Sequence, residues 1–526
     1  MDRVTSDVLG EAARRRSFAI ISHPDAGKTT LTEKLLLYAG VVQSAGAVKA
    51  RGGRTAARSD WMEMERERGI SVSSTVLQFP YGDCVLNLLD TPGHRDFSED
   101  TYRVLTAVDA AVMVLDSAKG IEPQTLKLFE VCRAQNTPIL TFLNKQDRPG
   151  LTPLELADDI AQKLQLATAP MVWPVGPSGE LVGLLDVMTD ELIRYDRTAR
   201  GAHIGGEERM KGDDAESLAG KWLTQAREEC ELLGAADGGW DREQFEAGQL
   251  SAVYAGSALT NVGVRQLLEA IVTIAPSPTP RAERSGLRRP LDAPFAGIVF
   301  KIQSNVDPSH RDQMAFLRVC SGRFERGEPL TQSSTGRVVT TKHAASVLGQ
   351  ERDTVDEAFP GDVVALVNAR NLRIGETVYA GKPVEFPPLP RFEPEIFATA
   401  RPLDVSKSKQ FRTGVEQLDA EGVIQALIED GNSSRPIIAT VGQLQMDVFK
   451  HRMRAEYNVE VELASNGIQV ARRTDQASTQ KLREIGGIRL ADRTDGALLA
   501  LFENRYRLER LQRDHPELTL RPIVDV

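Results

Sequence analysis

Hydrophobic and polar positions follow two different patterns along the chain, and the first of them fills the segment up to about residue 275. There, short apolar runs alternate with helical patterns such as 123–134 and 153–164. Strands that alternate with helices are typical of a doubly wound parallel sheet. Residues 176–250 are rich in Gly, Asp and Glu, and we expect them to form an insertion with two or three helices before the last strand. Residues 1–275 are thus predicted to form one α/β domain.

The pattern changes after the segment Ala275–Arg281, whose alternating prolines favour an extended linker. Short apolar runs separated by turns then predict strands at 295–302, 314–319, 338–340 and 363–367. Short strands with frequent turns favour an antiparallel β-barrel. We therefore expect a barrel domain over residues 290–386.

The last segment, 391–526, mixes strands with helices. Its pattern predicts strands at 397–402, 437–441 and 459–462 and helices at 407–420 and 443–456. A β-α-β order of this kind favours a ferredoxin-like α+β layer. The predicted fold class is therefore a multidomain α/β protein in which a doubly wound sheet is followed by an antiparallel β-barrel and a ferredoxin-like α+β domain.

A phosphate-binding loop follows the first apolar run, because the strand 18–21 leads into it and the helical pattern 31–36 comes after it. In such a strand–loop–helix unit, backbone N–H groups and the positive end of the helix face the phosphates of a nucleotide. Lys28 is expected to reach the β and γ oxygens, and the Thr29 hydroxyl to bind Mg²⁺. Ser22 is a departure, since it stands where the pattern has its first glycine. The loop residues predicted to bind the nucleotide are Ser22, His23, Pro24, Asp25, Ala26, Gly27, Lys28 and Thr29.

A second motif follows the apolar run 85–89, which predicts a buried strand. A carboxylate at the end of a neighbouring strand suits a phosphate-bound Mg²⁺, which Asp90 would bind through a water molecule. Gly93 would let the backbone approach the γ-phosphate closely. The nucleotide-binding residues predicted here are Asp90, Thr91, Pro92, Gly93 and His94.

Two further motifs indicate which base is bound. The carboxylate of Asp147 can accept hydrogen bonds from N1–H and the 2-amino group of guanine, and adenine lacks both donors. A loop after the short strand 253–255 would close over the base. The residues predicted to surround the guanine are Asn144, Lys145, Gln146 and Asp147, together with Ser257, Ala258 and Leu259. Four motifs in this order, each after a predicted strand, indicate a P-loop GTPase domain that binds GTP and GDP.

A long segment rich in Gly, Ala and Arg, 45–60, lies between the first helix and the strand at residue 85, and Arg68-Gly69-Ile70-Ser71 follows it. An irregular segment of this length inside a compact domain is usually functional or disordered. Its position predicts a switch segment that γ-phosphate and Mg²⁺ would order.

The motifs together resemble those of translational GTPases, in which Arg-Gly-Ile-Thr corresponds to Arg-Gly-Ile-Ser at 68–71. Ser71 then stands where that class has its Mg²⁺-binding threonine, and the hydroxyl is kept. The segments that carry a closer likeness lie at 23–30, 59–65, 90–103 and 389–392. They resemble the bacterial family of peptide chain release factor 3, and the resemblance covers nearly the whole chain.

This resemblance implies a ribosome-stimulated GTPase of translation termination. Its partners would be the ribosome, including ribosomal RNA, and class-I peptide chain release factors, whose departure it promotes after peptide release. Its cofactors would be GTP or GDP and Mg²⁺, the metal held by Thr29, Ser71 and, through water, Asp90. The catalytic residue would be His94, which would position the attacking water after ribosomal RNA aligns it.

Two other functions are compatible with the motifs. A translocase-like or rescue GTPase is one; we expect this protein to differ from elongation factor G, which has two further domains, one of which reaches the decoding site. A GTP-binding scaffold without catalytic activity is the other, and the presence of Lys28, Thr29, Asp90 and His94 disfavours it.

Composition and charge limit the partners and the cellular compartment that we expect for the protein. The formal net charge of −10 over 526 residues argues against non-specific coating of nucleic acid, so DNA is not an expected partner. No apolar run reaches about 18 residues, and the charged N-terminus lacks the apolar core of a secretory signal. Four isolated cysteines suit a reducing compartment. We expect a cytoplasmic monomer without a membrane partner.

Overall fold

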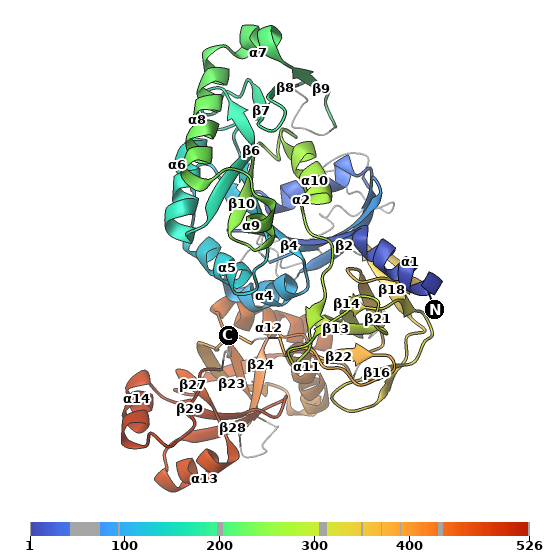
Figure 1. Ribbon diagram of the computed structural model, residues 1–526. Helices are drawn as coiled ribbons and strands as arrows, with labels where there is room; N and C mark the ends of the chain where they lie inside the picture. Colours follow the sequence, from blue (N-terminus) through green and yellow to red (C-terminus); the bar gives the residue numbers. More distant parts are fainter. Residues whose placement is uncertain are drawn as a thin grey trace.

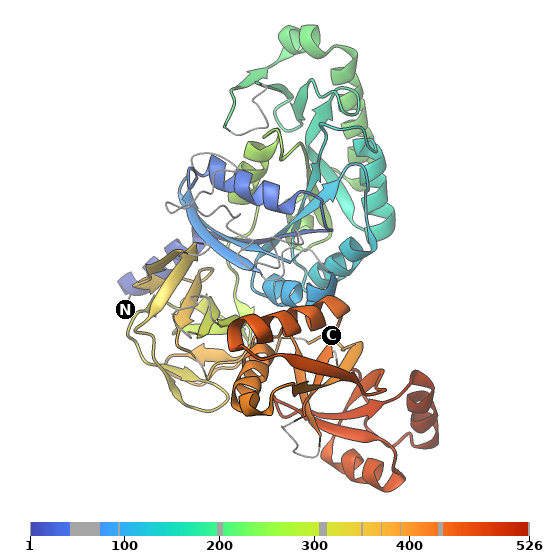
Figure 2. The same cartoon turned by 180° about the vertical axis from the view of Figure 1, so that it is seen from behind.

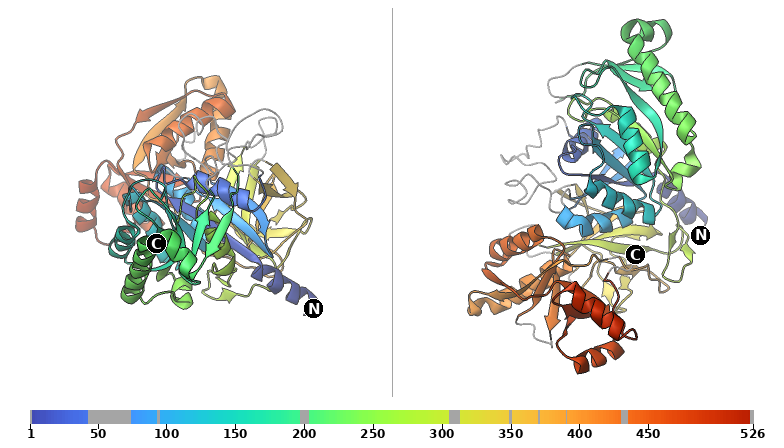
Figure 3. Two further views of the ribbon diagram at one scale, coloured as in Figure 1. Left: turned by 90° about the horizontal axis from the view of Figure 1, so that it is seen from above. Right: turned by 90° about the vertical axis from the view of Figure 1, so that its left-hand side faces the viewer.

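The computed structural model has three parts, each built on its own large sheet. The first domain (β1–β10) lies on one side, and the barrel domain (β11–β22) and the C-terminal domain (β23–β29) lie together on the other (Figure 1). Figure 2 shows the same arrangement from behind, and the right-hand view in Figure 3 shows it from the side. The structure describes residues 2–42, 74–92, 95–196, 203–304, 313–348, 351–369, 371–389, 391–429 and 435–523.

The first domain is a doubly wound sheet, as the sequence predicts. Within the described part of the chain its ten strands lie in the order β2-β3-β1-β4-β5-β10-β6-β7-β8-β9. The strands from β3 to β6 in this order run parallel, whereas β2 is antiparallel to β3. The six parallel strands are β1 (Arg15–Ser22), β3 (Cys84–Asp90), β4 (Ala110–Asp116), β5 (Ile139–Asn144), β6 (Ala167–Val175) and β10 (Leu250–Ala255), and β2 is Thr75–Tyr81.

Helices cover this sheet at the places where the pattern predicts them. Helix α5 has the predicted bounds, and the predicted helix 153–164 is present as an α-helix that continues into a π-helical segment. The helices of the first domain are α1 (Asp2–Ala13), α2 (Lys28–Tyr38), η1 (Arg95–Phe97), α4 (Ser98–Thr106), α5 (Pro123–Ala134), α6 (Pro153–Asp159), η2 (Ile160–Leu164) and α10 (Val264–Thr273). Helix α1 lies beside the barrel domain in Figure 1.

The segment 176–250 holds its predicted helices, α7 (Gly212–Ala219), α8 (Lys221–Asp237) and α9 (Arg242–Glu246). It also holds three strands that the sequence analysis did not predict. These strands extend the first sheet beyond β6 as an antiparallel meander. They are only four or five residues long, so they give little periodic signal: β7 (Gly183–Asp186), β8 (Glu191–Tyr195) and β9 (Glu207–Met210).

The barrel domain is antiparallel throughout its described pairings. One sheet has the order β17-β16-β22-β13-β14-β21-β18-β19, and two short ribbons accompany it. The four predicted strands correspond to β13, β14, β17 and β21. The strands are β11 (Arg281–Ala282), β12 (Arg288–Arg289), β13 (Ala296–Ser304), β14 (Gln313–Ser321), β15 (Phe324–Glu325), β16 (Leu330–Gln332), β17 (Val338–Val339), β18 (Ala344–Leu348), β19 (Glu351–Thr354), β20 (Glu357–Ala358), β21 (Val363–Val367) and β22 (Thr377–Tyr379).

The C-terminal domain begins with a β-α-β-β-α-β unit, which confirms the ferredoxin-like prediction. Its strands lie in the order β26-β23-β25-β24, and each neighbouring pair is antiparallel. The unit consists of β23 (Ile396–Pro402), η4 (Val405–Lys407), α11 (Ser408–Ala420), β24 (Gln425–Glu429), β25 (Ile437–Thr440), α12 (Gln443–Tyr457) and β26 (Val461–Ser465).

The same sheet then continues past β24, which the sequence analysis did not predict. Strand β28 pairs with β24, and β29 and β27 follow it outward. The described residues of this domain thus share one seven-stranded sheet. The added elements are β27 (Val470–Thr474), α13 (Gln476–Ile485), β28 (Arg489–Arg493), β29 (Leu498–Phe502) and α14 (Arg505–Asp514).

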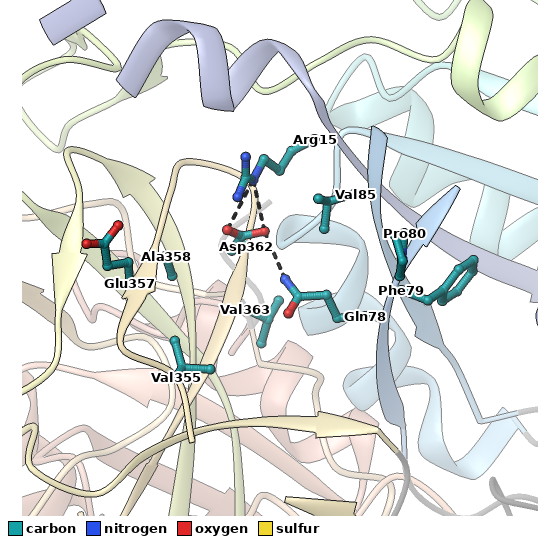
Figure 4. A pocket seen from close by; sticks show the side chains of 10 residues that line it. All are labelled: Arg15, Gln78, Phe79, Pro80, Val85, Val355, Glu357, Ala358, Asp362 and Val363. Carbon is teal, nitrogen blue, oxygen red and sulfur yellow. Dashed lines mark hydrogen bonds and ion pairs between the residues drawn. The ribbon is translucent and has the colours of Figure 1, made fainter. Parts of the chain in front are cut away.

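A buried carboxylate joins the first domain to the barrel domain. Asp362 accepts hydrogen bonds from Arg15 Nε at 3.2 Å, Gln78 Nε2 at 2.9 Å and Asn87 Nδ2 at 3.2 Å. The backbone N–H of Phe359 also donates to it, at 3.0 Å. A cavity of about 270 Å³ lies beside this group, between strand β2 and the barrel (Figure 4). Four donors thus satisfy the Asp362 carboxylate away from water.

No helix in the described ranges is both long and apolar enough to cross a membrane.

Candidate functional site

The carboxyl ends of the central strands bring the predicted motifs to one edge of the first sheet. Ile20 of β1 is in register with Asp90 of β3, and Asp116 of β4 with Asn144 of β5. Ala255, at the end of β10, is in register with Leu143. A crevice outside the carboxyl ends of parallel strands is where ligands bind in open α/β sheets.

The phosphate loop turns sharply between β1 and α2. Ser22 is the last residue of β1, and it is absent from the residues with positive φ, so a side chain is tolerated at this position. The turn is made further on, where Asp25 has φ 66° and Gly27 has φ 101°. A side chain is strained at the second of these angles, and a Cβ on Gly27 would lie 2.3 Å from Asn144 Nδ2. The loop therefore needs a glycine at position 27 but not at position 22.

Helix α2 begins at Lys28, directly after this turn, so the loop lies at its N-terminus. The first four N–H groups of a helix have no partner within the helix and carry the positive end of its dipole. Thr29 is the second residue of α2 and is partly exposed. The loop thus combines free backbone donors with a hydroxyl group at the same edge of the sheet.

A buried ion pair lies beside the loop. Lys28 Nζ is 3.1 Å from Asp90 Oδ1, and both side chains are less than a tenth exposed. This contact lacks the angles of a hydrogen bond, and Lys28 Nζ donates none to the other described residues, so the Asp90 carboxylate balances its charge but leaves its N–H donors unused. The next residue, Thr91, is held by a hydrogen bond from its Oγ1 to the carbonyl oxygen of Ile20 at 2.7 Å. A buried ammonium with unused donors is suited to an anionic ligand, because an uncompensated buried donor costs free energy.

Asn144 connects the phosphate loop to the loop after β10. Its Nδ2 donates to the carbonyl oxygen of Ala26 at 2.7 Å, and its Oδ1 accepts from the N–H of Ala258 at 2.8 Å. The loop that contains Ala258 is closed by a hydrogen bond from Ser257 N to Val262 O at 2.9 Å. Asn144 is therefore a structural link between two motifs, and the sequence alone does not reveal this role.

Lys145 makes a second link of the same kind. Its Nζ donates to the carbonyl oxygen of Asp25 at 2.6 Å and to Asp116 Oδ2 at 2.7 Å. Burial alone would raise the pKa of Asp116, but the hydrogen bonds from Lys145 and from the N–H of Ala118 outweigh it and hold the pKa below its usual value. Asp116 stays charged and fixes the lysine. No motif in the sequence marks Asp116, although a carboxylate that ends the buried run 110–116 was an available signal.

Asp147 presents an unused acceptor. Its Oδ1 is buried and has no hydrogen-bond partner in the described part of the chain. Its other oxygen lies 3.9 Å from Arg148 Nε, too far for a hydrogen bond. Between Lys145 and Asp147, Gln146 is anchored by its N–H, which donates to the Gly256 carbonyl at 3.0 Å. A buried carboxylate oxygen without a donor indicates that a ligand supplies one.

His23 has a structural position within the loop. The ring is fully buried, and Nδ1 lies 2.6 Å from the Pro24 carbonyl oxygen and 2.7 Å from Glu122 Oε2. Burial lowers the pKa of His23, although the Glu122 carboxylate acts in the opposite direction. A neutral imidazole with its proton on Nδ1 therefore ties the loop to the residue that precedes α5. Glu122 is a second site residue that the sequence analysis did not predict.

The remaining predicted residues are distributed as follows. Leu259 lies on the surface, 39% exposed, after Ala258. Pro92 is buried behind Thr91. The predicted metal ligand Ser71, the predicted catalytic His94 and its neighbour Gly93 lie outside the described residues, and so does the segment 45–60.

Comparison with curated proteins shows close relatives along the whole chain. It is 46% identical over 519 residues to "Peptide chain release factor 3" of Synechococcus elongatus, covering 98% of this chain and 93% of that protein. The chain belongs to the release factor 3 family. Two further members have the same 46% identity: the protein of Synechocystis sp., with 99% and 97% of the two chains covered, and that of Symbiobacterium thermophilum, with 97% of each.

Family models agree with this assignment for each part of the chain. Residues 13–277 match the "Elongation factor Tu GTP binding domain", and residues 294–381 match "Elongation factor G domain 2". Residues 386–512 match the "Class II release factor RF3, C-terminal domain". This release factor 3 family member is thus a translational GTPase.

A solved structure supports the fold. A crystal structure of a protein from Thermus thermophilus aligns with a TM-score of 0.70 at 26% identity, covering 88% of this chain and 69% of that one. The multidomain α/β fold class that the sequence predicts is therefore confirmed.

Proposed function

We propose that the edge of the first sheet binds GTP and GDP with Mg²⁺. Two observations support this: the buried Lys28 ammonium has unused donors, and the buried Asp147 Oδ1 has no donor of its own among the described residues. Lys28 would pair with the β and γ phosphates. Asp147 would accept hydrogen bonds from N1–H and the 2-amino group of guanine. The hydrogen bonds that Asn144 and Lys145 make to the phosphate loop would hold it at a fixed distance from the segment that contains Asp147. We call these two segments the recognition loops.

The residues at this edge also suit a magnesium ion. Mg²⁺ prefers oxygen ligands and is commonly bound by one or two protein groups together with phosphate oxygens. The hydroxyl of Thr29 and the carboxylate of Asp90 are oxygen donors at the loop, and Ser71 would supply a second hydroxyl. When bound, the ion would neutralise the charge that develops on the phosphates.

We assign the catalytic role to His94. A water-positioning group is what phosphoryl transfer to water requires from the protein, because the reaction needs alignment and charge stabilisation more than covalent chemistry. In the sequence His94 follows Asp90 by four residues, and this closeness to a predicted metal-binding residue supports the assignment.

For the whole chain we propose a ribosome-stimulated GTPase of translation termination in the cytoplasm. It would bind the ribosome in its GTP form, promote the departure of a class-I release factor after peptide release, and leave after hydrolysis. The observation that carries this proposal is the match of residues 386–512 to the release factor C-terminal domain, since the other two family matches are to domains named for elongation factors. Ribosomal RNA would be part of the surface that it contacts.

The decisive experiment measures how fast a labelled class-I release factor leaves ribosomes after peptide release. With GTP and the wild-type protein, the dissociation rate is expected to rise. His94→Ala should bind GTP with unchanged affinity but lose ribosome-stimulated turnover, whereas Lys28→Ala should lose nucleotide binding itself. A dissociation rate that is the same with and without the protein would refute the proposal.

Two further measurements on the same ribosomes, of tRNA movement and of GTP hydrolysis, separate the other functions. Movement of tRNA by this protein alone would favour a translocase-like GTPase. Absence of hydrolysis with and without ribosomes would favour a GTP-binding scaffold. We expect neither, and the protein should act as a monomer.

A further inference from the structure

The segment that follows His94 is docked against the C-terminal domain. Asp96, in η1, is 4% exposed, and its Oδ2 accepts a hydrogen bond from the backbone N–H of Leu444 at 2.8 Å. Leu444 is the second residue of α12. The N–H groups of a first helical turn are normally capped by a residue of the same helix. Here a carboxylate from another domain satisfies one of them.

Position 442 is shaped for this contact. Gly442 precedes α12 at its N-cap, and a Cβ there would lie 2.0 Å from Asp96 Cγ. Its φ of −145° is available to any residue, so glycine is required for space and not for backbone conformation. The missing side chain thus leaves room for the carboxylate of Asp96. Its negative charge also interacts favourably with the positive end of the α12 dipole.

Apolar contacts support the same interface. Phe97 forms a buried cluster with Leu444 and Val448 of α12. A little further along the chain, the ring of Tyr102 in α4 meets Phe392 edge to face, with 5.3 Å between ring centroids. The docking of η1 and α4 therefore rests on packing as well as on the Asp96 hydrogen bond.

The other end of the segment is held by the first domain. Thr91 is fixed to the Ile20 carbonyl, and Thr101 Oγ1 donates to the carbonyl oxygen of Pro92 at 3.5 Å. In the sequence, His94 is two residues from Pro92 and two residues from Asp96. Consecutive Cα atoms are about 3.8 Å apart, so each of these two described anchors lies within about 8 Å of chain from His94.

We propose that Asp96 is a positioning residue for GTP hydrolysis. By binding the N-terminus of α12, it fixes one end of the segment that carries His94, so that turnover depends on the docking of the C-terminal domain. This inference rests on the catalytic role proposed for His94. It assigns Asp96 no contact with the nucleotide.

The contact can be tested from both of its sides. Asp96→Ala removes the acceptor, and Gly442→Ala places a methyl group where the carboxylate lies. Asp96→Asn keeps an oxygen that can accept from the Leu444 N–H. Gly234→Ala in α8 is the matched control, because no atom lies within 4 Å of the position of its added Cβ.

Ribosome-stimulated GTP hydrolysis should be measured as kcat and as the ribosome concentration at half-maximal rate. We expect Asp96→Ala and Gly442→Ala to lower kcat about tenfold, since small errors in the placement of reacting groups cost one to two orders of magnitude. Asp96→Asn and Gly234→Ala should stay within about twofold of wild type. GTP affinity should be unchanged in all four variants, and this measurement also verifies that each has folded.

Several outcomes would overturn the inference. Unchanged kcat in both Asp96→Ala and Gly442→Ala is one of them. A shift only in the ribosome concentration at half-maximal rate would show a binding role instead. Asp96→Asn as slow as Asp96→Ala would show that the hydrogen bond is not what matters. A wild-type protein that ribosomes do not stimulate would instead refute the proposed function, so the two failures are distinguishable.

Discussion

The substitution Gly27→Ala tests how the two recognition loops depend on each other. An added Cβ would lie 2.3 Å from Asn144 Nδ2, the atom that donates to the Ala26 carbonyl. The change therefore acts in two ways. It places an L-residue at φ 101°, and it displaces the asparagine that also accepts from the N–H of Ala258.

The expected loss of nucleotide affinity follows from the free-energy costs of these two effects. An L-residue in a left-handed conformation costs about 1–2 kcal/mol. A buried hydrogen bond that is lost while its groups stay buried costs about 1–3 kcal/mol. Their sum is about 2–5 kcal/mol, and every 1.4 kcal/mol corresponds to a tenfold change in affinity. Since the loop must recover its shape to hold phosphates, GDP and GTP should both bind at least about thirtyfold more weakly.

The assay is an equilibrium titration with a fluorescent guanine nucleotide, run alongside thermal unfolding. Gly40→Ala is the matched control, because Gly40 also has positive φ, 73°, but no atom lies within 4 Å of an added Cβ. It should lower stability by about 1 kcal/mol and leave nucleotide affinity within about twofold. If Gly27→Ala binds GDP within about threefold of wild type, the coupling through Asn144 is refuted.

Three further predictions concern other parts of the chain. Asp147→Asn should bind xanthine nucleotides in preference to guanine nucleotides, because the new amide can donate to the 2-oxo group. Competition between GTP and XTP measures this preference. A retained preference for GTP would show that Asp147 does not recognise the base. Asp362→Ala should lower the free energy of unfolding by about 2–3 kcal/mol, because it leaves the buried donors of Gln78 and Asn87 without their acceptor, whereas Arg15 keeps its ion pair with Glu11. Asp356→Ala, which removes an exposed partner of Arg326, should cost less than about 1 kcal/mol. Equal losses in urea titrations would contradict the difference in burial. Burial alone would raise the pKa of Asp495, but the hydrogen bonds and charge of Arg493 outweigh it and lower the pKa to about 2. The contribution of Asp495 to the free energy of unfolding, about 1 kcal/mol, is therefore present above about pH 4 and is lost as pH falls toward about 2. Asp495→Asn should flatten the dependence of stability on pH in that window, and an unchanged dependence would show that Asp495 is not its source.

Much of the architecture could be predicted because the relevant strands are long and apolar. The strands that end in Ser22, Asp90 and Asn144 are buried along most of their length, so they stand out as mainly apolar runs, although Asn87 and Thr141 interrupt two of them. Motifs at their ends then lie at one edge of the sheet as a consequence of parallel pairing. This is why the common position of the described motif residues at one edge of the sheet was predictable, whereas their binding of a nucleotide stays a prediction.

Other features depend on contacts between distant segments, which periodicity does not report. The strands β7–β9 are too short to give a pattern, and the continuation of the last sheet depends on pairing between β24 and β28, which lie far apart in the sequence. Glu122 and Asp116 belong to no recognised motif, yet they contact His23 and Lys145. Such residues are recognisable only when the folded chain brings their partners beside them.

The continuous sheet of the C-terminal domain has a mechanical consequence. Helix α12 packs with the ferredoxin-like strands at one end of the sheet, whereas α13 and α14 belong to its other end (Figure 1). Backbone hydrogen bonds join each neighbouring pair of its described strands, so the two ends belong to one sheet and not to two separate units. For a rotation of the whole sheet about α12, where Asp96 is held, we expect the exposed Tyr506 on α14 to move further than α12 itself. The fold thus has the geometry to turn a change of ångström size beside the nucleotide edge into a larger displacement at the far tip of the molecule.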